Sequence, residues 1–348
     1  MRTRTKRSLL LAPLALAAAL GLFVGIGVRA SDHPTAPAAL GPSVPFSGVP
    51  FSRMEALIDR PGPLSTKTFV SADWQVDREG LIDLAHPEAK KADLKGGLEP
   101  IQIYLHVVRH PQRGTFFIDT GVERAVRDAP ERAVLRGVMA KAMHIDLMKV
   151  IHDTASVVAA EGAPAGVFFT HLHTDHIAGL PDIPKGTPLY TGPGETSQRF
   201  FLNAFAKGPT DEALAGHAPI SELPFARDPD GRFEGILDVF GDGSFFALWV
   251  PGHTAGSAAY LARTEAGPVL YVGDTCHTQW GWEHGVPPGQ FTRDGKQNAE
   301  SLTRLRALVA AHPKMEVRLG HQPAGPASPR ADGSTPSASQ ARPTAAAP

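Results

Sequence analysis

The stretch Thr170–Gly179, THLHTDHIAG, carries the strongest structural signal in this chain of 348 residues. It follows an apolar run, Val167–Phe169, which predicts a buried strand. Residues i and i+2 of an extended segment point to the same side, so two of its histidines can face one point. A solvated, histidine-rich loop is the alternative, but ligand-type side chains at this spacing directly after a buried strand favour a site for a divalent ion such as Zn²⁺. The ligand-type side chains are His171, His173, Asp175 and His176.

Composition excludes several classes of protein. Hydrophobic residues make up 42% of the chain, enough for a substantial core in one large domain or two ordinary ones. The 34 basic and 35 acidic residues leave a formal charge of −1, so no basic surface for nucleic acid is expected. Cys276 is the one cysteine, which excludes an intrachain disulfide framework. The sequence carries no signal for an oligomeric state.

Residues 1–30 have the pattern of an export signal. A basic start, with Arg2 and Arg4 among its cations, precedes the uncharged run Leu9–Val28. This pattern predicts either a signal peptide cleaved before Ser31 or an uncleaved anchor that attaches the protein to a membrane through residues 9–28. Both alternatives place the rest of the chain outside the cytoplasm, as a periplasmic, secreted or anchored protein.

Composition also predicts the domain boundaries. Residues 31–50 are rich in Pro, Ala, Gly and Ser and predict a flexible linker. Residues 51–322 contain the apolar runs and the candidate site residues, and we expect them to form one domain. Residues 323–348 have few apolar side chains and predict a disordered tail.

Three more ligand-type residues stand where apolar strands are expected to end. His253 lies in PGHTAGS, Asp274 in VGDT and His321 in LGH. Each is a weak signal alone, because polar residues are common in turns, but together with the histidine cluster they predict a shared site. Asp119 in FIDTG is either a turn-forming residue or a carboxylate that orients metal ligands.

In this order the motifs resemble the metallo-β-lactamase superfamily, over roughly Thr68–His321. The resemblance implies an α/β (α+β) fold, a four-layer αββα sandwich of two mixed sheets with metals at one end. It also implies two metal ions, expected to be Zn²⁺, with Fe, Mn or Co as other possibilities. One ion would be held by His171, His173 and His253, the second by Asp175, His176 and His321, with Asp274 bridging the two.

The resemblance implies a hydrolase for a small-molecule substrate. A hydroxide bridging the two ions would attack an ester-like bond, and a lactone is the expected substrate. Asp175 and Asp274 are the expected catalytic residues: Asp175 would pass a proton to the leaving group, and Asp274 would bridge the two metal ions. Asp119 would support the ligands from behind.

Other activities stay open within this resemblance. The interval of 77 positions from His176 to His253 is similar to the long interval of exported lactonases and organophosphate hydrolases. Hydrolysis of an organophosphate, an aryl ester or a thioester is therefore an alternative. A mononuclear iron persulfide dioxygenase is a second alternative, and a protein that binds a ligand without turnover is a third.

The residues that follow Asp274 have two interpretations each. His277 is either a donor that stabilises a developing oxyanion or a solvated loop residue. Trp280 and Trp282 either line an apolar pocket or pack in the core. Cys276 is expected to be a passive neighbour of the site.

Periodicity predicts several helices and strands. We expect helices in two pieces over Glu123–His144, and over Leu147–Ala160, Glu195–Ala206 and Asn298–His312. Gly208–Gly235 is turn-rich and could form a lid or a pocket wall, while the phenylalanines at 200, 201 and 205 form either an apolar contact surface or core. Strands are expected over Thr68–Trp74, Ile101–Val108, Thr115–Gly121, Ser244–Val250, Ala258–Ala262, Val269–Val272 and Met315–Leu319.

Overall fold

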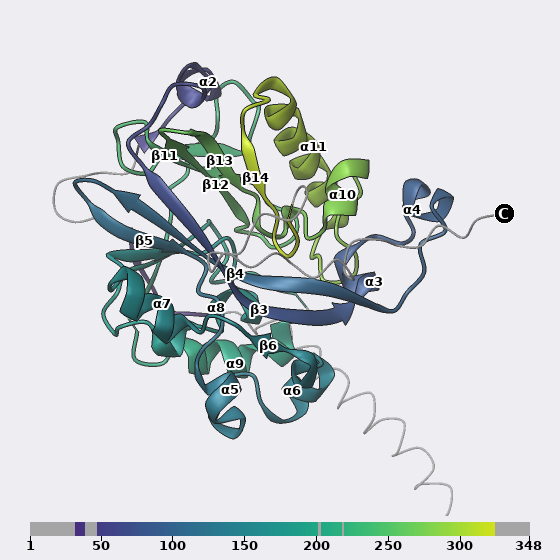
Figure 1. Ribbon diagram of the computed structural model, residues 1–348. Coiled ribbons are helices and arrows are strands. Elements are labelled where there is room, and N and C mark those ends of the chain that lie inside the picture. Colours follow the sequence, from purple (N-terminus) through teal and green to yellow (C-terminus); the bar gives the residue numbers. More distant parts are fainter. Residues whose placement is uncertain (1–31, 39–46, 201–202, 218, 324–348) are drawn as a thin grey trace, which may run out of the picture.

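Two β-sheets lie face to face, with helices on both outer sides (Figure 1). This computed structural model describes residues 32–38, 47–200, 203–217 and 219–323. The layers run helix, sheet, sheet, helix, which confirms the predicted αββα sandwich.

The first sheet has eight strands in the order β1-β9-β8-β7-β5-β4-β3-β6. The long antiparallel pair β3–β4 joins β5, and β5, β7, β8 and β9 run parallel to one another. The strand bounds are β1 Thr35–Pro37, β3 Ser65–Asp77, β4 Leu98–His110, β5 Gly114–Ile118, β6 Lys149–Val150, β7 Gly166–Phe168, β8 Leu189–Thr191 and β9 Ile220–Glu222.

The second sheet has six strands in the order β14-β13-β12-β11-β10-β2. All its pairs are antiparallel except β13–β14. The bounds are β2 Ser47–Gly48, β10 Gly235–Asp238, β11 Phe245–Trp249, β12 Ala258–Thr264, β13 Gly267–Tyr271 and β14 Glu316–Arg318.

Helices connect the strands and cover the sheets. The α-helices are α2 Phe51–Ile58, α3 Arg78–Leu81, α4 Pro87–Lys91, α5 Ala125–Asp128, α6 Gly137–Ala142, α7 Thr154–Glu161, α8 Thr174–Ile177, α9 Asn203–Leu214, α10 Gln279–His284 and α11 Gly295–Ala311. Single 3₁₀ turns are η1 Pro130–Arg132, η2 Ile145–Leu147, η3 Leu180–Asp182 and η4 Gly273–Thr275.

The hydrophobic core lies in layers that match this stacking. Aromatic rings fill the space between the sheets: Phe168 of β7 lies 5.7 Å from Tyr260 of β12, between ring centroids. On the outer side of the second sheet, α11 buries leucines at 302, 305 and 308, one turn apart along a single face. On the outer side of the first sheet, Val157 of α7 and Ile177 of α8 are buried.

Strand direction brings the candidate site residues to one edge of the sandwich. β11 and β13 are both antiparallel to β12, so they run the same way, and β14 is parallel to β13. The segments after these three strands therefore leave the second sheet at the same edge. In the first sheet, the parallel strands β5 and β7 likewise deliver Asp119 and Thr170 to one edge.

The prediction of a flexible linker over residues 31–50 is wrong for two short segments, which form strands. Thr35–Pro37 pairs in parallel with β9, and Ser47–Gly48 pairs with β10. Both are edge strands, where a chain pairs on one side only and proline is tolerated. Residues 39–46 between them lie outside the described part of the chain, so the described ends of this segment belong to the sandwich.

The helix predicted over Leu147–Ala160 forms only in its second half. Lys149–Val150 pairs with β3 as a short strand, and the backbone N–H groups of Ile151 and His152 both donate to Ser71 O. The helix then begins after Asp153, whose side chain accepts from Ser156 N at 2.9 Å. This cap, together with pairing to a distant strand, overrides the local helical pattern.

The helix predicted over Glu195–Ala206 is also displaced along the chain. The observed helix α9 begins at Asn203 and ends at Leu214, within the stretch expected to be turn-rich. Glu222 holds the preceding loop by accepting from Gly194 N and Thr196 N at 2.9 and 3.1 Å. Phe205 on this helix is 46% exposed, so it is not part of the core.

Two sequence predictions fall outside the described residues. These are the export signal over residues 1–30 and nearly all of the tail over residues 323–348, of which the structure describes Pro323 alone. Within the described ranges, none of the helices has the length and apolar character needed to cross a membrane.

Glu123, which follows the first sheet at the loop after β5, provides a test of pH-dependent stability. Burial raises the pKa of Glu123 from 4.5 to about 7, although its carboxylate accepts from Val134 N. The folded protein thus holds a proton that the unfolded chain releases, so Glu123 lowers stability as pH rises from 4.5 to about 7. We expect the free energy of unfolding of Glu123→Gln, relative to wild type, to increase between about pH 5 and pH 8. Urea denaturation at equal metal saturation measures this difference, and a difference independent of pH would contradict the assignment.

Candidate metal centre

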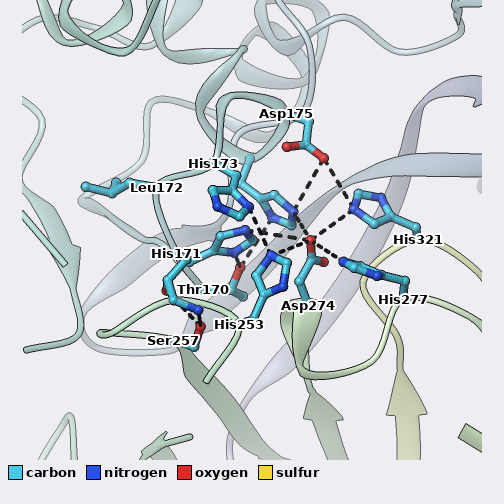
Figure 2. Close-up of polar contacts among 12 residues, drawn as sticks. Thr170, His171, Leu172, His173, Asp175, His253, Ser257, Asp274, His277 and His321 are labelled. Carbon is cyan, nitrogen blue, oxygen red and sulfur yellow. Dashed lines mark hydrogen bonds and ion pairs between the residues drawn. The ribbon is translucent and has the colours of Figure 1, made fainter. Parts of the chain in front are cut away.

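The seven residues that the sequence singled out come together at one edge of the sandwich (Figure 2). They form two groups that share Asp274, and within each group the candidate donor atoms lie within 4.8 Å of one another. The first group is His171, His173, His253 and Asp274, and the second is Asp175, His176, Asp274 and His321. Within the described ranges, no other set of His, Cys, Asp and Glu side chains is grouped in this way.

One oxygen of Asp274 lies at the centre of both groups. Five imidazole nitrogens surround Oδ2 of this carboxylate, and the side chain of Asp274 is 3% exposed. The distances from Oδ2 to the Nε2 atoms are 3.6 Å for His171, 3.2 Å for His176, 3.5 Å for His253, 2.9 Å for His277 and 3.3 Å for His321. A shared carboxylate at this position can keep two cations a fixed distance apart.

Local backbone geometry places each ligand-type residue. α8 begins directly after His173 and brings Asp175 and His176 back toward the end of β7. The loop just before α11 holds the His253 segment, because Arg293 N donates to His253 O at 2.9 Å. Gly320 precedes His321 and has no side chain, which is required because a Cβ there would lie 2.1 Å from Asp274 Oδ1.

Asp119 lies behind the second group and orients it. Its Oδ2 accepts from His176 Nδ1 at 2.7 Å and from Thr170 Oγ1 at 2.8 Å, while Oδ1 accepts from Thr170 N at 2.8 Å. Of the two interpretations of Asp119, the orienting carboxylate is therefore the one observed. Holding Nδ1–H of His176 leaves Nε2 of the same ring facing Asp274.

Replacing Asp119 with asparagine should weaken metal binding about 10- to 100-fold, because the oriented tautomer of His176 loses its carboxylate. Asparagine tolerates the backbone φ of 54° at this position. Asp242→Asn is the control, since it breaks a carboxylate–histidine pair with His110 that lies outside both groups. Chelator competition measures both affinities, and equal weakening in the two variants would contradict this role for Asp119.

His277 is a further member of the centre. It is 2% exposed, so its interpretation as a solvated loop residue is wrong. Its Nδ1 lies 3.1 Å from the carbonyl oxygen of Leu81, which can only accept, so Nδ1 carries a proton. In a neutral ring Nε2 is then the acceptor nitrogen, and it lies 2.9 Å from Asp274 Oδ2, which is also an acceptor. Two acceptors at this distance require a proton or a cation between or beside them.

The other imidazoles are held in the same way. His321 Nδ1 lies 3.0 Å from the carbonyl oxygen of Gln102, and His253 Nδ1 lies 3.2 Å from Thr292 Oγ1. Their Nε2 atoms therefore face the centre of the cluster. Histidines that ligate metals commonly have the other ring nitrogen fixed by a hydrogen bond of this kind.

The unpaired atoms at the centre fit divalent cations. His171 Nε2, His176 Nε2 and Asp274 Oδ1 are buried without a hydrogen-bond partner within the described residues. His253 Nε2 and His173 Nδ1 lie 2.9 Å apart. Two nitrogens bound to one zinc ion at right or tetrahedral angles would lie about 3.0–3.4 Å apart. Imidazole and carboxylate donors suit Zn, Mn, Fe and Co, so the residues present fit the metals that the sequence predicted.

The histidines of the two groups fall into two kinds, those with a lowered pKa and those with a raised pKa. Burial and neighbouring imidazoles hold the pKa of His171 and His253 well below the usual value, and burial lowers that of His173 to about 4. These rings are neutral and can donate a lone pair. Burial would also lower the pKa of His321, but Asp274 and Asp175 raise it to about 10. Metal binding must therefore release a proton from His321.

A cavity lies beside the second group, between the two sheets. One wall is formed by Asp175, His176 and His321, which are candidate ligands. The opposite wall is polar and aromatic and includes Tyr104, His106, Tyr271 and Arg318. No sequence pattern marks this wall, because its residues alternate with core positions along β4, β13 and β14.

The remaining neighbours of Asp274 serve the core. Trp282 packs against the hydrophobic side chains beneath α11, and Trp280 packs against the hydrophobic side chains beside β3 and β4. Core packing is therefore the interpretation that holds for both tryptophans. Cys276 is buried, and its thiol donates to Thr278 O at 3.4 Å. Burial raises the pKa of Cys276 to about 12, as expected of a passive neighbour.

Comparison with known sequences gives a family match. A family model described as the metallo-beta-lactamase superfamily matches residues 99–321, more than half of the chain. Gamma-lactamase FDB1 of Fusarium pseudograminearum is 29% identical over 224 residues, covering 58% of this chain and 52% of that protein. Gamma-lactamase MBL2 of Gibberella moniliformis is 31% identical, covering 46% and 69%. N-acyl homoserine lactonase AttM of Azorhizobium caulinodans is 29% identical, covering 49% and 63%. The chain thus spans about half the length of the first of these relatives.

Solved structures share the fold at low identity. A quorum-quenching N-acyl homoserine lactone lactonase matches with a TM-score of 0.53 and 18% identity, covering 76% of this chain and 94% of that one. A probable metal-dependent hydrolase from Staphylococcus aureus matches with a TM-score of 0.56 and 11% identity, covering 76% and 91%. At these identities the likeness concerns the arrangement of helices and strands.

Proposed function

The chain belongs to the metallo-beta-lactamase superfamily, and on that premise we propose that it is a dinuclear metal-dependent hydrolase that opens a lactone. One observation carries the proposal: two groups of ligand-type side chains share Asp274, and buried atoms within them, such as His171 Nε2, have no hydrogen-bond partner among the described residues. We further propose that the seven residues of these groups are the ligands and that the ions are Zn²⁺.

The geometry supports different roles for Asp274 and Asp175. Two bound divalent ions would supply an activated water as nucleophile and positive charge for the oxygen that becomes negative. Asp274 holds the two groups together through one oxygen. The side chain of Asp175 is 16% exposed, against 3% for Asp274 and His321, so it faces the open side of the centre. From there its carboxylate can carry a proton to the leaving group.

Relatives support the choice of substrate. The relative AttM is named an N-acyl homoserine lactonase and matches over 49% of this chain. Two other relatives are named gamma-lactamases, and these favour a second candidate function, hydrolysis of a cyclic amide. Both reactions add water to a carbonyl in a small ring, so they place the same demands on the metal centre.

A substrate screen with metal analysis tests the proposal. The purified chain is assayed with lactones, γ-lactams, aryl esters, thioesters and phosphotriesters. We expect lactones to have the highest kcat/KM and the protein to bind two divalent ions per chain. Higher activity on γ-lactams would replace the lactone proposal with the second candidate. One iron per chain with oxygen uptake on persulfides, or no turnover of any substrate, would overturn the hydrolase proposal.

Export is proposed separately, on the sequence of residues 1–30 alone. Cell fractionation should place the protein outside the cytoplasm, in the periplasm or medium if the segment is cleaved and in the membrane fraction if it is retained. Recovery in the cytoplasm would contradict the proposal.

A further inference from the structure

Glu195 is a buried carboxylate next to the metal centre that is not part of either group. It is 1% exposed and lies in the loop that follows β8. Because β8 runs parallel to β7, this loop leaves the first sheet at the same edge as the Thr170 segment. A buried carboxylate must be compensated by hydrogen bonds, so its partners show what it holds in place.

The two oxygens of Glu195 bind two different ligand-bearing segments. Oε1 accepts from Leu172 N at 2.9 Å, and Oε2 accepts from Gly256 N at 2.8 Å. Leu172 lies between His171 and His173, and its side chain points away from the cluster (Figure 2). Its backbone N–H, rather than its side chain, therefore fixes the position of this segment relative to Glu195.

Gln198 completes the connection. Its Nε2 donates to Glu195 Oε1 at 2.9 Å, and its Oε1 accepts from Ala255 N at 3.0 Å. The segment after His253 is thus bound at two successive backbone N–H groups. The backbone of Gly256 packs tightly against Glu195, because a Cβ on Gly256 would lie 2.6 Å from the Cβ of Glu195.

These contacts bear most directly on the first group. His171 and His173 lie on one bound segment and His253 on the other, and together they supply three of the four members of the first group. The second group has a separate support, since Asp119 orients His176. Each group thus has its own buried carboxylate behind it, Glu195 for the first and Asp119 for the second.

We propose that Glu195 is a positioning residue for the first metal ion: it sets the distance between the His171–His173 pair and His253. The inference rests on the proposed function, in that it requires a metal ion in the first group. It adds that the affinity of this ion depends on Glu195 while the affinity of the second ion does not.

Glu195→Gln is the variant that tests this role, because it keeps the size of the side chain. An amide has one oxygen where the carboxylate has two, so its NH₂ group must face the N–H of Leu172 or Gly256. We expect one of the two metal affinities to fall about 10- to 100-fold and the other to change less than about twofold. Zn²⁺ titration of the metal-free protein against a competing chelator measures both.

Asp238→Asn is the matched control. Asp238 is 2% exposed and accepts from the backbone N–H groups of Gly241 and Gly243, each at 2.9 Å. It precedes β11, whereas His253 follows that strand, so Asp238 lies at the far end of β11 from the metal centre. Both variants lose a hydrogen bond from a backbone N–H to a buried carboxylate. Thermal unfolding of the metal-free proteins measures how much stability each variant loses.

The outcomes separate the two proposals. Two metal affinities in wild type, one of them lowered in Glu195→Gln and neither in Asp238→Asn, support the positioning role. Two affinities that are unchanged in Glu195→Gln overturn that role and leave the proposed function intact. Equal weakening of both sites, or the same weakening in Asp238→Asn, shows a general structural effect and also overturns it. A wild-type chain that binds no metal would contradict the proposed function itself.

Discussion

Replacing Asp274 with alanine is expected to remove bound metal and hydrolytic activity together. Oδ2 of Asp274 lies within 3.6 Å of the Nε2 atoms of His171, His176, His253 and His321, so both groups lose their common donor. We expect kcat/KM to fall about 10³-fold or more, because charge stabilisation by both ions is affected. Metal content per chain and initial rates on the best substrate of the screen measure the effect.

Two further variants make this result interpretable. Asp274→Asn keeps the side-chain shape and should lose metal in the same way, while its circular dichroism shows whether the fold is retained. Asp238→Ala removes a carboxylate that is as deeply buried, at 2% exposed against 4% for Asp274, and should leave metal content unchanged. Activity that survives in Asp274→Ala with the metal lost would show that the dinuclear mechanism is wrong.

Removing the metal from wild-type protein should lower its thermal stability strongly. Without cations, buried atoms such as His171 Nε2 and Asp274 Oδ1 have no hydrogen-bond partner among the described residues, and a buried polar group without a hydrogen bond is costly. An ion present at about 1,000 times its Kd stabilises the folded state by about 4 kcal/mol. For two ions this corresponds to a fall in Tm on the order of 15 °C upon chelation.

The pH dependence of this stabilisation has a definite sign. Ligand imidazoles must be neutral to bind metal, and the pKa of His321 is raised to about 10 by Asp274 and Asp175, so protons compete with the ions increasingly as pH falls below that value. The difference in Tm between metal-loaded and chelated protein should therefore shrink from about pH 8 to pH 5. Chelation that removes all metal, as verified by elemental analysis, without changing Tm would contradict the proposed centre.

Much of the candidate site could be predicted from the sequence, because its residues follow strands. Strands of like direction end at the same edge of a sheet. An apolar run followed by His253, Asp274 or His321 therefore predicts that these side chains lie close together in the folded chain. The structure brings all seven residues into two groups around Asp274. The αββα architecture was implied by the resemblance of these motifs to the metallo-β-lactamase superfamily.

The roles that the sequence left open or did not indicate depend on contacts between distant parts of the chain. The imidazole of His277 is buried because it bonds to the carbonyl of Leu81, 196 positions away. Glu195 binds Gly256, which lies 61 positions further along the chain. The segment Glu195–Ala206 has a helical pattern, yet its first part is a loop because buried hydrogen bonds to other segments stabilise that conformation more than a helix would.

Residue type and the period of an apolar run are local properties, so the candidate metal ligands and the strand that each of them follows could be read from the chain alone. Only the tertiary structure decided which oxygen the two groups share, which nitrogen of each imidazole faces the centre, and which carboxylates hold the ligand segments together. These depend on the packing of two sheets against each other, which brings backbone and side-chain groups within hydrogen-bond distance regardless of their separation along the chain.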